Sequence, residues 1–512
     1  MKKTWLLLVV SLAVALAGCG GVKKGGEVGG SSVSDGLASD KLLELSIHMH
    51  YWDSTPFDDE WVPFKKAVEL TNIKLKGTVS KSVSDSEQAF NIMIASDDVP
   101  DIIHSTTKNM DKYGQEGALI PLNDLIDEYA PNIKKALDEF PGFKEMAMAS
   151  DGNVYHIPSA REGLASVGIF IRQDWLDKLD LQMPTTTEEY YNVLSAFRNN
   201  DPNGNGAKDE VPLFFRSKVI DTLLPYFEAE AGWYYRDGQV KYGRIEPNFK
   251  TAMKEARKWY EEGLIDKEVY TRGGKSRDIL FTDNLGGSTI DWFVSTTAYN
   301  HILADKVPGF KVVAVPPITD INGNRPHLLG RESVQELGWG ISVNNKHPIE
   351  TIKYMDFWLS EEGRELINFG IEGEHFDKID GFPALKPEIL NAPETALTYL
   401  NNIGLGARIG TIFSMNREKQ MIDEIGIAGW DMYEPVVERP FMTPKFSNEE
   451  YKVINAKLMA IQTYAIEKEQ RWLMGIENID STFDSYVEQL KKMGVEELIS
   501  AYDQAYKRSL SR

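Results

Sequence analysis

The sequence predicts an α/β protein with more than one domain, in which mainly parallel sheets are flanked by helices and the C-terminal region is helical. Between residues 42 and 343, short apolar runs typical of buried strands alternate with segments of helical period. Such alternation is typical of parallel sheets covered by helices. From residue 349 onward, helical periods dominate. The chain has 512 residues, more than one hydrophobic core usually organises.

The first part of the chain alternates between the two periods. Residues 42–49 (LLELSIHM) form an apolar run that predicts a strand, and Trp61, Phe64 and Val68 give the following segment a helical apolar stripe. The predicted strands here are 42–49, 74–79, 101–103 and 152–158. The predicted helices are 57–72, 86–96 and a helix that ends at Tyr129.

The second part continues the pattern and then becomes helical. Thr185 and Glu188 form a predicted capping box for a helix over 188–199, with an inward stripe of Tyr191, Leu194 and Phe197. The predicted strands are 169–172, 211–215, 285–293, 311–315 and 339–343. The predicted helices are 174–179, 247–262, 349–359, 449–473, 481–493 and 495–506. Residues 401–446 show no clean period.

Charge and composition exclude some classes of partner. The formal net charge is −21, which argues against nucleic acid, because phosphates are bound by clustered Lys and Arg. The hydrophobic content of 42% and the charged content of 26% are ordinary for a folded soluble protein. Cys19 is the single cysteine, so no intrachain disulfide can form.

The N-terminus has the features of a secretion signal. Lys2 and Lys3 precede an apolar run from Trp5 to Leu16, which is short for a membrane span. The run ends in Leu-Ala-Gly-Cys19, which resembles the bacterial lipobox. We therefore expect a signal peptide over 1–18, lipidation of Cys19 by acyl chains such as palmitate, and a flexible Gly/Ser-rich tether over 19–40. The protein would then lie on the extracytoplasmic face of the cell membrane. The alternative is a membrane-anchor helix with an incidental cysteine.

A polar loop over 201–210 (DPNGNGAKDE) has the composition of a calcium site. It places oxygen-bearing side chains at positions 1, 3, 5, 9 and 10, and its glycines at positions 4 and 6 permit a tight turn. Ca²⁺ takes six to eight oxygen ligands, and the start of the loop matches an EF-hand. Position 12 is Pro212, so the usual bidentate Glu is absent there. The alternative is a polar turn between a helix and a strand.

Four stretches together resemble one family. They are LAGC at 16–19, DVPDII at 98–103, the long segment from IRQDWLDKL to DEVPL over 171–213, and YMDFWLSEEGRELINFG at 354–370. By these motifs the chain resembles the extracellular solute-binding lipoproteins (family 1) of carbohydrate ABC transporters. It is similar to the alginate-binding proteins and the LplA-type lipoproteins of Bacillus and Paenibacillus within that family.

The resemblance implies a type II periplasmic-binding-protein fold with two lobes and a ligand cleft between them. The first lobe would comprise 41–157 plus 286–340, and the second 158–285 plus 341–512. It also implies a structural Ca²⁺ bound by the loop residues Asp201, Asn203, Asn205, Ala207 (through its carbonyl), Asp209 and Glu210. The protein would be a monomer that binds an oligosaccharide and delivers it to the transmembrane subunits of an ABC permease.

A sugar-binding cleft needs flat aromatic side chains for the apolar ring faces and charged groups for the hydroxyl rim. Aromatic residues near strand ends or in aperiodic segments are therefore candidates, namely Tyr51, Trp52, Trp292, Trp339, Trp430 and Tyr433. The polar candidates are Arg161, Asp291, Arg331, Glu332 and Arg439. For each one, core packing or a surface position is the competing interpretation.

Two other functions stay open. The first is a secreted polysaccharide-active enzyme, which would need two carboxylates in one cleft. With 77 acidic residues, such a pair can always be proposed and therefore decides nothing. The sequence contains no Gly-x-Ser-x-Gly elbow, His-Glu-x-x-His helix or phosphate-binding loop. We therefore expect no enzymatic activity. The second alternative is a surface lipoprotein without a role in transport.

Overall fold

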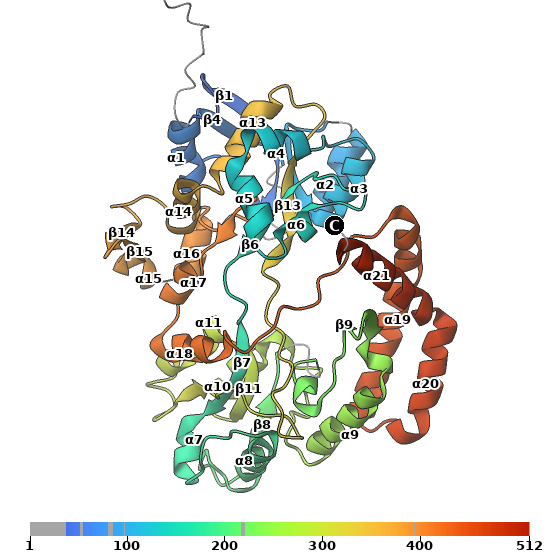
Figure 1. Ribbon diagram of the computed structural model, residues 1–512. Coiled ribbons are helices and arrows are strands. Elements are labelled where there is room, and N and C mark those ends of the chain that lie inside the picture. The colour runs from blue at the N-terminus through green and yellow to red at the C-terminus, as the bar shows by residue number, and fades with distance from the viewer. Residues whose placement is uncertain are drawn as a thin grey trace, which may run out of the picture.

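The computed structural model describes residues 37–51, 55–79, 85–96, 98–216, 221–393 and 395–510, without the side chains of His50, Tyr51 and Thr55. The predicted signal peptide, Cys19 and most of the tether lie outside these residues. Figure 1 shows two lobes, each with its own sheet, joined by crossing segments. In the described part of the chain, no helix combines the length and apolar character that a membrane crossing requires.

The first lobe contains a six-stranded sheet in the order β16-β6-β13-β5-β1-β4. Its strands are β1 Leu43–His48, β4 Ile73–Gly77, β5 Ile102–Thr106, β6 Ile157–Arg161, β13 Val334–Ile341 and β16 Ile412–Phe413. β1 is parallel to β4 and β5, while β13 is antiparallel to both β5 and β6. A two-residue pairing of β2 His50–Tyr51 with β3 Thr55–Pro56 follows the end of β1.

Helices cover the first sheet and bury its apolar side chains. They are α1 Val62–Thr71, α2 Ser86–Ser96, α3 Thr107–Gln115, α4 Asn123–Tyr129, α5 Pro131–Glu139, α6 Phe143–Ala147, α13 Pro348–Phe357 and α14 Glu361–Phe369. A small outer unit adds β14 Phe376–Ile379, β15 Phe382–Leu385, α15 Pro387–Leu390, α16 Ala396–Asn402 and α17 Met415–Gln420. Trp61, Trp339 and Trp358 are buried in this core.

The second lobe contains a four-stranded sheet in the order β12-β7-β11-β8. Its strands are β7 Val167–Arg172, β8 Val211–Phe214, β11 Gly286–Trp292 and β12 Val312–Ala314, and a separate hairpin pairs β9 Trp233–Arg236 with β10 Gln239–Tyr242. Its α-helices are α7 Gln173–Lys178, α8 Thr187–Asn199, α9 Pro247–Glu261, α10 Ser276–Thr282, α11 Phe293–Thr296, α12 Tyr299–Ile302 and α18 Glu424–Tyr433. Short 3₁₀ turns are η1 Leu224–Phe227, η2 Gly243–Ile245 and η3 Gly273–Lys275.

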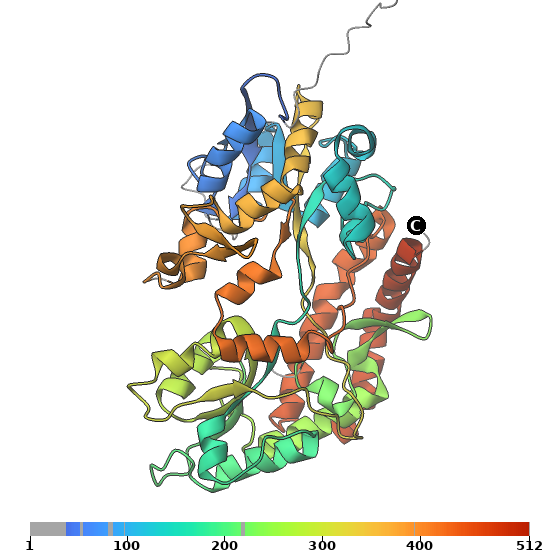
Figure 2. The ribbon, with the colours of Figure 1, turned by 60° about the vertical axis from the view of Figure 1, so that its left-hand side comes forward.

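Three long C-terminal helices complete the chain. They are α19 Asn448–Leu473, α20 Ile479–Met493 and α21 Val495–Leu510. α19 begins with a capping box of Ser447 and Glu450, and α20 ends at Gly494 with a positive φ of 96°. Their apolar faces belong to the core of the second lobe. In both views they run along that lobe and reach the first lobe at their upper end (Figures 1 and 2).

The expected α/β class with a helical C-terminal region is confirmed, but the sheets are mixed rather than mainly parallel. β7 pairs antiparallel with β11 and β12, and β13 pairs antiparallel with its two neighbours. The chain alternates between the lobes, so strands enter each sheet from both directions. The predicted cap of α8 is also displaced by one residue, because Thr186 accepts from the Glu189 amide.

The segments are distributed between the lobes differently from our expectation. β11 and β12, expected in the first lobe, pair with β7 of the second lobe. The chain returns to the first lobe only at β13. α13 and α14, expected in the second lobe, pack in the first, where Ile352, Trp358 and Ile367 share a core with Ile341.

Candidate functional site

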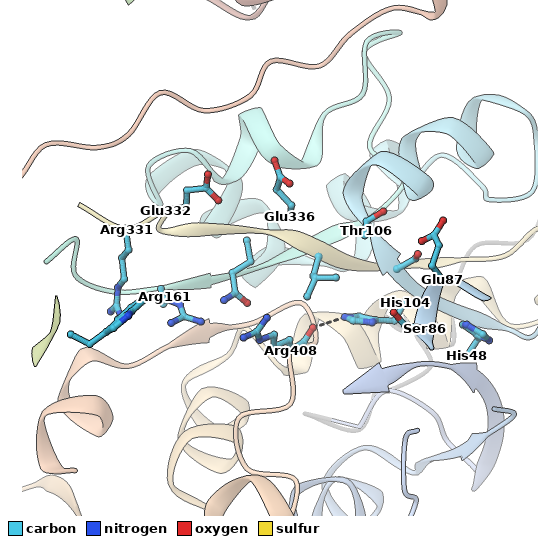
Figure 3. A pocket seen from close by; sticks show the side chains of 14 residues that line it. His48, Ser86, Glu87, His104, Thr106, Arg161, Arg331, Glu332, Glu336 and Arg408 are labelled. Atoms are coloured by element: carbon cyan, nitrogen blue, oxygen red, sulfur yellow. Dashed lines mark hydrogen bonds between the residues drawn. The ribbon is translucent and has the colours of Figure 1, made fainter. Parts of the chain in front are cut away.

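A cavity of about 710 Å³ lies between the lobes (Figure 3). Most of its lining comes from the first lobe, at the carboxyl ends of β1 and β5 and along β13, and Trp292 at the end of β11 contributes from the second lobe. Its lining residues are His48, Ser86, Glu87, His104, Ser105, Thr106, Arg161, Trp292, Arg331, Glu332, Gln335, Glu336, Leu337 and Arg408. Ligands commonly bind at the carboxyl ends of strands in open α/β sheets.

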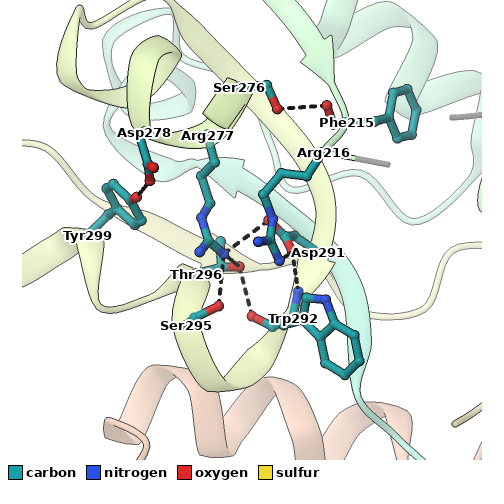
Figure 4. A network of polar contacts seen from close by, with 10 residues as sticks. All are labelled: Phe215, Arg216, Ser276, Arg277, Asp278, Asp291, Trp292, Ser295, Thr296 and Tyr299. Atoms are coloured by element: carbon teal, nitrogen blue, oxygen red, sulfur yellow. Dashed lines mark hydrogen bonds and ion pairs between the residues drawn. The ribbon is translucent and has the colours of Figure 1, made fainter. Parts of the chain in front are cut away.

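Trp292 is the aromatic surface of this cavity. Its side chain is 45% exposed, although large apolar side chains are usually buried. Its amide donates to Asp291 Oδ1 at 2.8 Å, and its carbonyl accepts from Thr296 Oγ1 at 2.7 Å (Figure 4). An exposed indole that faces a cavity can stack on the apolar face of a sugar ring.

A group of arginines lies on one side of the cavity. Arg331 pairs with Glu418 at 2.6 Å and also donates to the carbonyls of Gly163 and Glu162. Arg161 lies 3.6 Å from the same Glu418 carboxylate. Burial lowers the pKa of Arg161 to about 10; Glu418 opposes that shift, and nearby arginines such as Arg331 add to it. Two arginines therefore share the Glu418 carboxylate at this point.

Three carboxylates also line the cavity. Figure 3 shows Glu332 and Glu336 on the opposite side of β13 from Arg161 and Arg408, and Glu87 at the start of α2 lines the same cavity. The lining therefore includes both guanidinium donors and carboxylate acceptors. This arrangement suits a ligand with many hydroxyl groups, each of which can donate and accept.

A second cavity of about 520 Å³ shares Arg331 and Glu332 with the lining of the main one. Tyr226, Trp233 and Tyr433 are among the residues that line this second space.

Of the residues predicted to contact a ligand, the structure places Arg161, Trp292, Arg331 and Glu332 in the lining of the main cavity. Tyr433 lines the second cavity, but its hydroxyl accepts the Ile169 amide, and Arg439 lines a further cavity of about 540 Å³. Trp52 lies outside the described residues, as does the side chain of Tyr51.

Three of the predicted ligand contacts are interior residues. Trp339 is 0% exposed in the core of the first lobe, and Trp430 is 0% exposed beneath Arg331, whose guanidinium lies 5.1 Å from the indole ring. Asp291 is 4% exposed and is bound by two arginines. They cannot contact a ligand in this conformation, because side chains of neighbouring elements cover them.

Sequence reasoning missed several residues that line the cavity. His48 and His104 lie at or near the carboxyl ends of β1 and β5, so the rule for α/β sheets could have found them. Glu87 and Arg408 carry no local signal, because only the tertiary fold brings their segments to β13.

The loop over 201–210 is a tight turn held by hydrogen bonds among its own residues. Asp201 Oδ1 accepts the amides of Gly204 and Asn205 at 2.8 and 3.0 Å, and its Oδ2 accepts that of Gly206 at 2.9 Å. The Asn203 and Asn205 amides both face Asp209. Among the described residues, no cluster of three or more His, Cys, Asp or Glu side chains has the geometry of a metal site.

Glu210 provides a test of whether this loop suits a cation. Its side chain is buried, with the residue 2% exposed, and neither carboxylate oxygen has a hydrogen-bond partner. Burial raises the pKa of Glu210, and the neighbouring Asp209 and Asp201 raise it further. A buried carboxylate without a partner is costly. The donor set therefore suits a hard divalent cation, which would compensate this charge.

The two-lobed fold and the cavity between the lobes are typical of solute receptors that enclose a ligand between two domains. The bacterial extracellular solute-binding protein family matches residues 56–365, and the chain belongs to this family.

Individual relatives agree with this assignment. The chain is 37% identical to the alginate-binding protein AlgQ2, solved without calcium ion, with a TM-score of 0.77 over 92% of this chain and 99% of that one. It is 28% identical to the fructooligosaccharide ABC transporter substrate-binding protein FusA of Streptococcus pneumoniae, over 83% of this chain and 82% of FusA. It is 26% identical to the polygalacturonan/rhamnogalacturonan-binding protein YtcQ of Bacillus subtilis, over 74% and 75%. The fold is confirmed as the type II periplasmic-binding-protein fold.

Proposed function

We propose that this chain is the substrate-binding component of an ABC importer, which binds an oligosaccharide in the interlobe cleft and delivers it to the permease. The observation that carries the proposal is the exposed Trp292 ring, which faces a cavity rimmed by Arg161, Arg408 and three glutamates. An aromatic platform with a charged rim is the combination that binds a sugar ring. The carbohydrate cargo of the relatives supports the same function.

Binding is coupled to closure of the lobes. Trp292 belongs to the second lobe, while the rim belongs mainly to the first. A sugar that contacts both is bound more tightly by the closed arrangement, and so shifts the population toward it. The permease would then recognise the closed, loaded form.

The remaining assignments follow from the sequence. Cys19 after the apolar run supports a lipid anchor on the extracytoplasmic face of the membrane. The protein acts as a monomer. Asp201, Asn203, Asn205, Ala207, Asp209 and Glu210 bind Ca²⁺, which stabilises the loop and has no part in chemistry. The unpartnered Glu210 carboxylate supports this site.

A uronic-acid-containing oligosaccharide is favoured over a neutral one by a specific observation. Glu418 is shared by Arg161 and Arg331, and both arginines line the main cavity together with Arg408. A ligand carboxylate at Arg161 would accept charge-assisted hydrogen bonds from its guanidinium.

The test is titration calorimetry of the purified protein against neutral and uronic oligosaccharides of matched length. Binding of one sugar class, with the sugar recovered unchanged after incubation, is the expected result. Shortened products would instead identify a polysaccharide-active enzyme. Absence of binding to every sugar would refute the carbohydrate cargo.

A further inference from the structure

Trp292 is held by its backbone on both sides, although its ring is exposed. Its amide donates to Asp291 and its carbonyl accepts from Thr296, the fourth residue after it. Figure 4 shows both contacts beside the indole. The peptide groups that set the direction of the side chain are therefore fixed from the interior of the second lobe.

Asp291 is itself fixed by two arginines. Arg216 forms a bidentate pair with it, at 2.8 Å from Nε to Oδ2 and 2.6 Å from Nη2 to Oδ1. Arg277 Nη1 donates to Oδ2 at 3.0 Å. With the Trp292 amide, the carboxylate accepts four hydrogen bonds. A carboxylate offers about four lone-pair sites, so none is left for a sugar hydroxyl.

Arg277 connects this carboxylate to the next helix. Its Nη1 also donates to Ser295 Oγ and Thr296 Oγ1, each at 3.0 Å, and its guanidinium lies 5.1 Å from the Tyr299 ring. Ser276, beside Arg277, donates to the Phe215 carbonyl at 2.7 Å. The network thus joins the end of β8, the start of α10, the end of β11 and α11.

We propose that Asp291 is a positioning residue that presents Trp292 to the ligand, and that it does not contact the ligand itself. This deepens the proposed function and rests on it. An exposed side chain ordered before binding avoids part of the entropy cost of being ordered by the ligand. The two arginines hold the Asp291 carboxylate in position, and Asp291 and Thr296 then keep the Trp292 backbone in place.

Two variants weaken this network by different routes. Asp291→Asn replaces one acceptor oxygen by an amide group that faces arginine donors. Thr296→Val has nearly the same shape and removes the hydroxyl that bonds the Trp292 carbonyl. The matched control is Asp266→Asn, since Asp266 is also 4% exposed in the second lobe and pairs with Arg272 at 2.8 Å, but lines none of the cavities described above.

The first measurement needs no ligand. In protein labelled with 5-fluorotryptophan, ¹⁹F NMR reports each indole, and the Trp292→Phe variant assigns the Trp292 resonance. We expect one sharp Trp292 resonance in the parent protein, and a broadened or split one in the Asp291→Asn and Thr296→Val variants. Asp266→Asn should leave it unchanged. An unchanged Trp292 resonance in Asp291→Asn would overturn the proposal.

The second measurement is the affinity for tetragalacturonate and for nystose. Asp291→Asn and Thr296→Val should weaken whichever sugar binds by roughly three- to tenfold, and Asp266→Asn by less than about twofold. In the Trp292→Ala background, adding Asp291→Asn should weaken sugar affinity by less than about twofold more, since the Trp292 ring is already absent. If Asp291→Asn weakens affinity by its full three- to tenfold in the Trp292→Ala background as well, Asp291 acts by direct ligand contact or through a general structural defect. That result would overturn the proposal. If the parent protein binds neither sugar, the proposed function is refuted for those classes, and the ¹⁹F result still decides the positioning role.

Discussion

Removal of Ca²⁺ should destabilise the second lobe through Glu210. The perturbation is a chelator, compared with millimolar Ca²⁺, on the purified protein. The structure gives the reason, because the Glu210 carboxylate is buried and has no hydrogen-bond partner on either oxygen. Without a cation, the folded protein must either bury this charge or take up a proton.

The size of the effect follows from binding linkage. A ligand that binds only the folded state adds about 2.7 kcal/mol at a hundredfold excess over its Kd. For a cooperative unit of 150–250 residues, each kcal/mol shifts Tm by roughly 2–4 °C. We therefore expect calcium to raise the Tm of the second lobe by roughly 5–10 °C.

Differential scanning calorimetry with three variants separates this account from a general effect of salt. Asp201→Asn should abolish most of the calcium-dependent shift. Glu210→Gln should also abolish it, and in chelator should be more stable than the parent protein, because an unpaired buried charge is removed. The matched control is Asp320→Asn. Asp320 accepts two loop amides in the same manner, at 2.9 Å from Asn322 and 2.8 Å from Asn324, and the calcium shift should survive its replacement.

Two results would refute the reasoning. One is a protein whose unfolding is indifferent to chelator at every calcium concentration. The other is a Glu210→Gln variant that is less stable than the parent in chelator, which would mean that the carboxylate is stabilised without a cation.

Three further predictions concern charged groups elsewhere. Burial raises the pKa of Glu469 to about 7, against the opposing effect of Arg244, so the folded state holds this proton more tightly than the unfolded state. The free energy of unfolding should therefore fall by roughly 3 kcal/mol from pH 4.5 to pH 7. Denaturant titrations across this range should show a weaker pH dependence of stability for Glu469→Gln. Lys445→Met removes the cation 2.8 Å from Asp111 and should lower the free energy of unfolding by roughly 3–5 kcal/mol. Adding Asp111→Asn should restore part of that stability, because the unpaired charge is then removed. An unchanged denaturation midpoint in Lys445→Met would contradict this. Arg161→Gln should weaken the affinity for uronic oligosaccharides by about tenfold in calorimetry, and the affinity for neutral ones far less. Equal losses for the two classes would count against a carboxylate contact.

The sequence by itself determined the local elements. Helical period predicted α9 and α20 nearly to their ends, and short apolar runs predicted β1, β7 and β11. These signals are local, because the spacing of apolar residues within one segment reveals its period without reference to the element that it packs against. The motifs over 171–213 and 354–370 likewise identified the family before any contact was known.

Only the tertiary structure decided which elements meet. An apolar strand carries no mark of its partner, so the placement of β11 and β12 in the second sheet, and of α13 in the first lobe, depends on packing across distant segments. The same limit applies to the site. Trp292 and Trp339 both belong to predicted strands, yet one ends its strand at the cleft with 45% of its surface exposed, and the other is 0% exposed beneath a helix layer. The physical reason is that exposure is a property of the neighbours, and the neighbours are set by the fold.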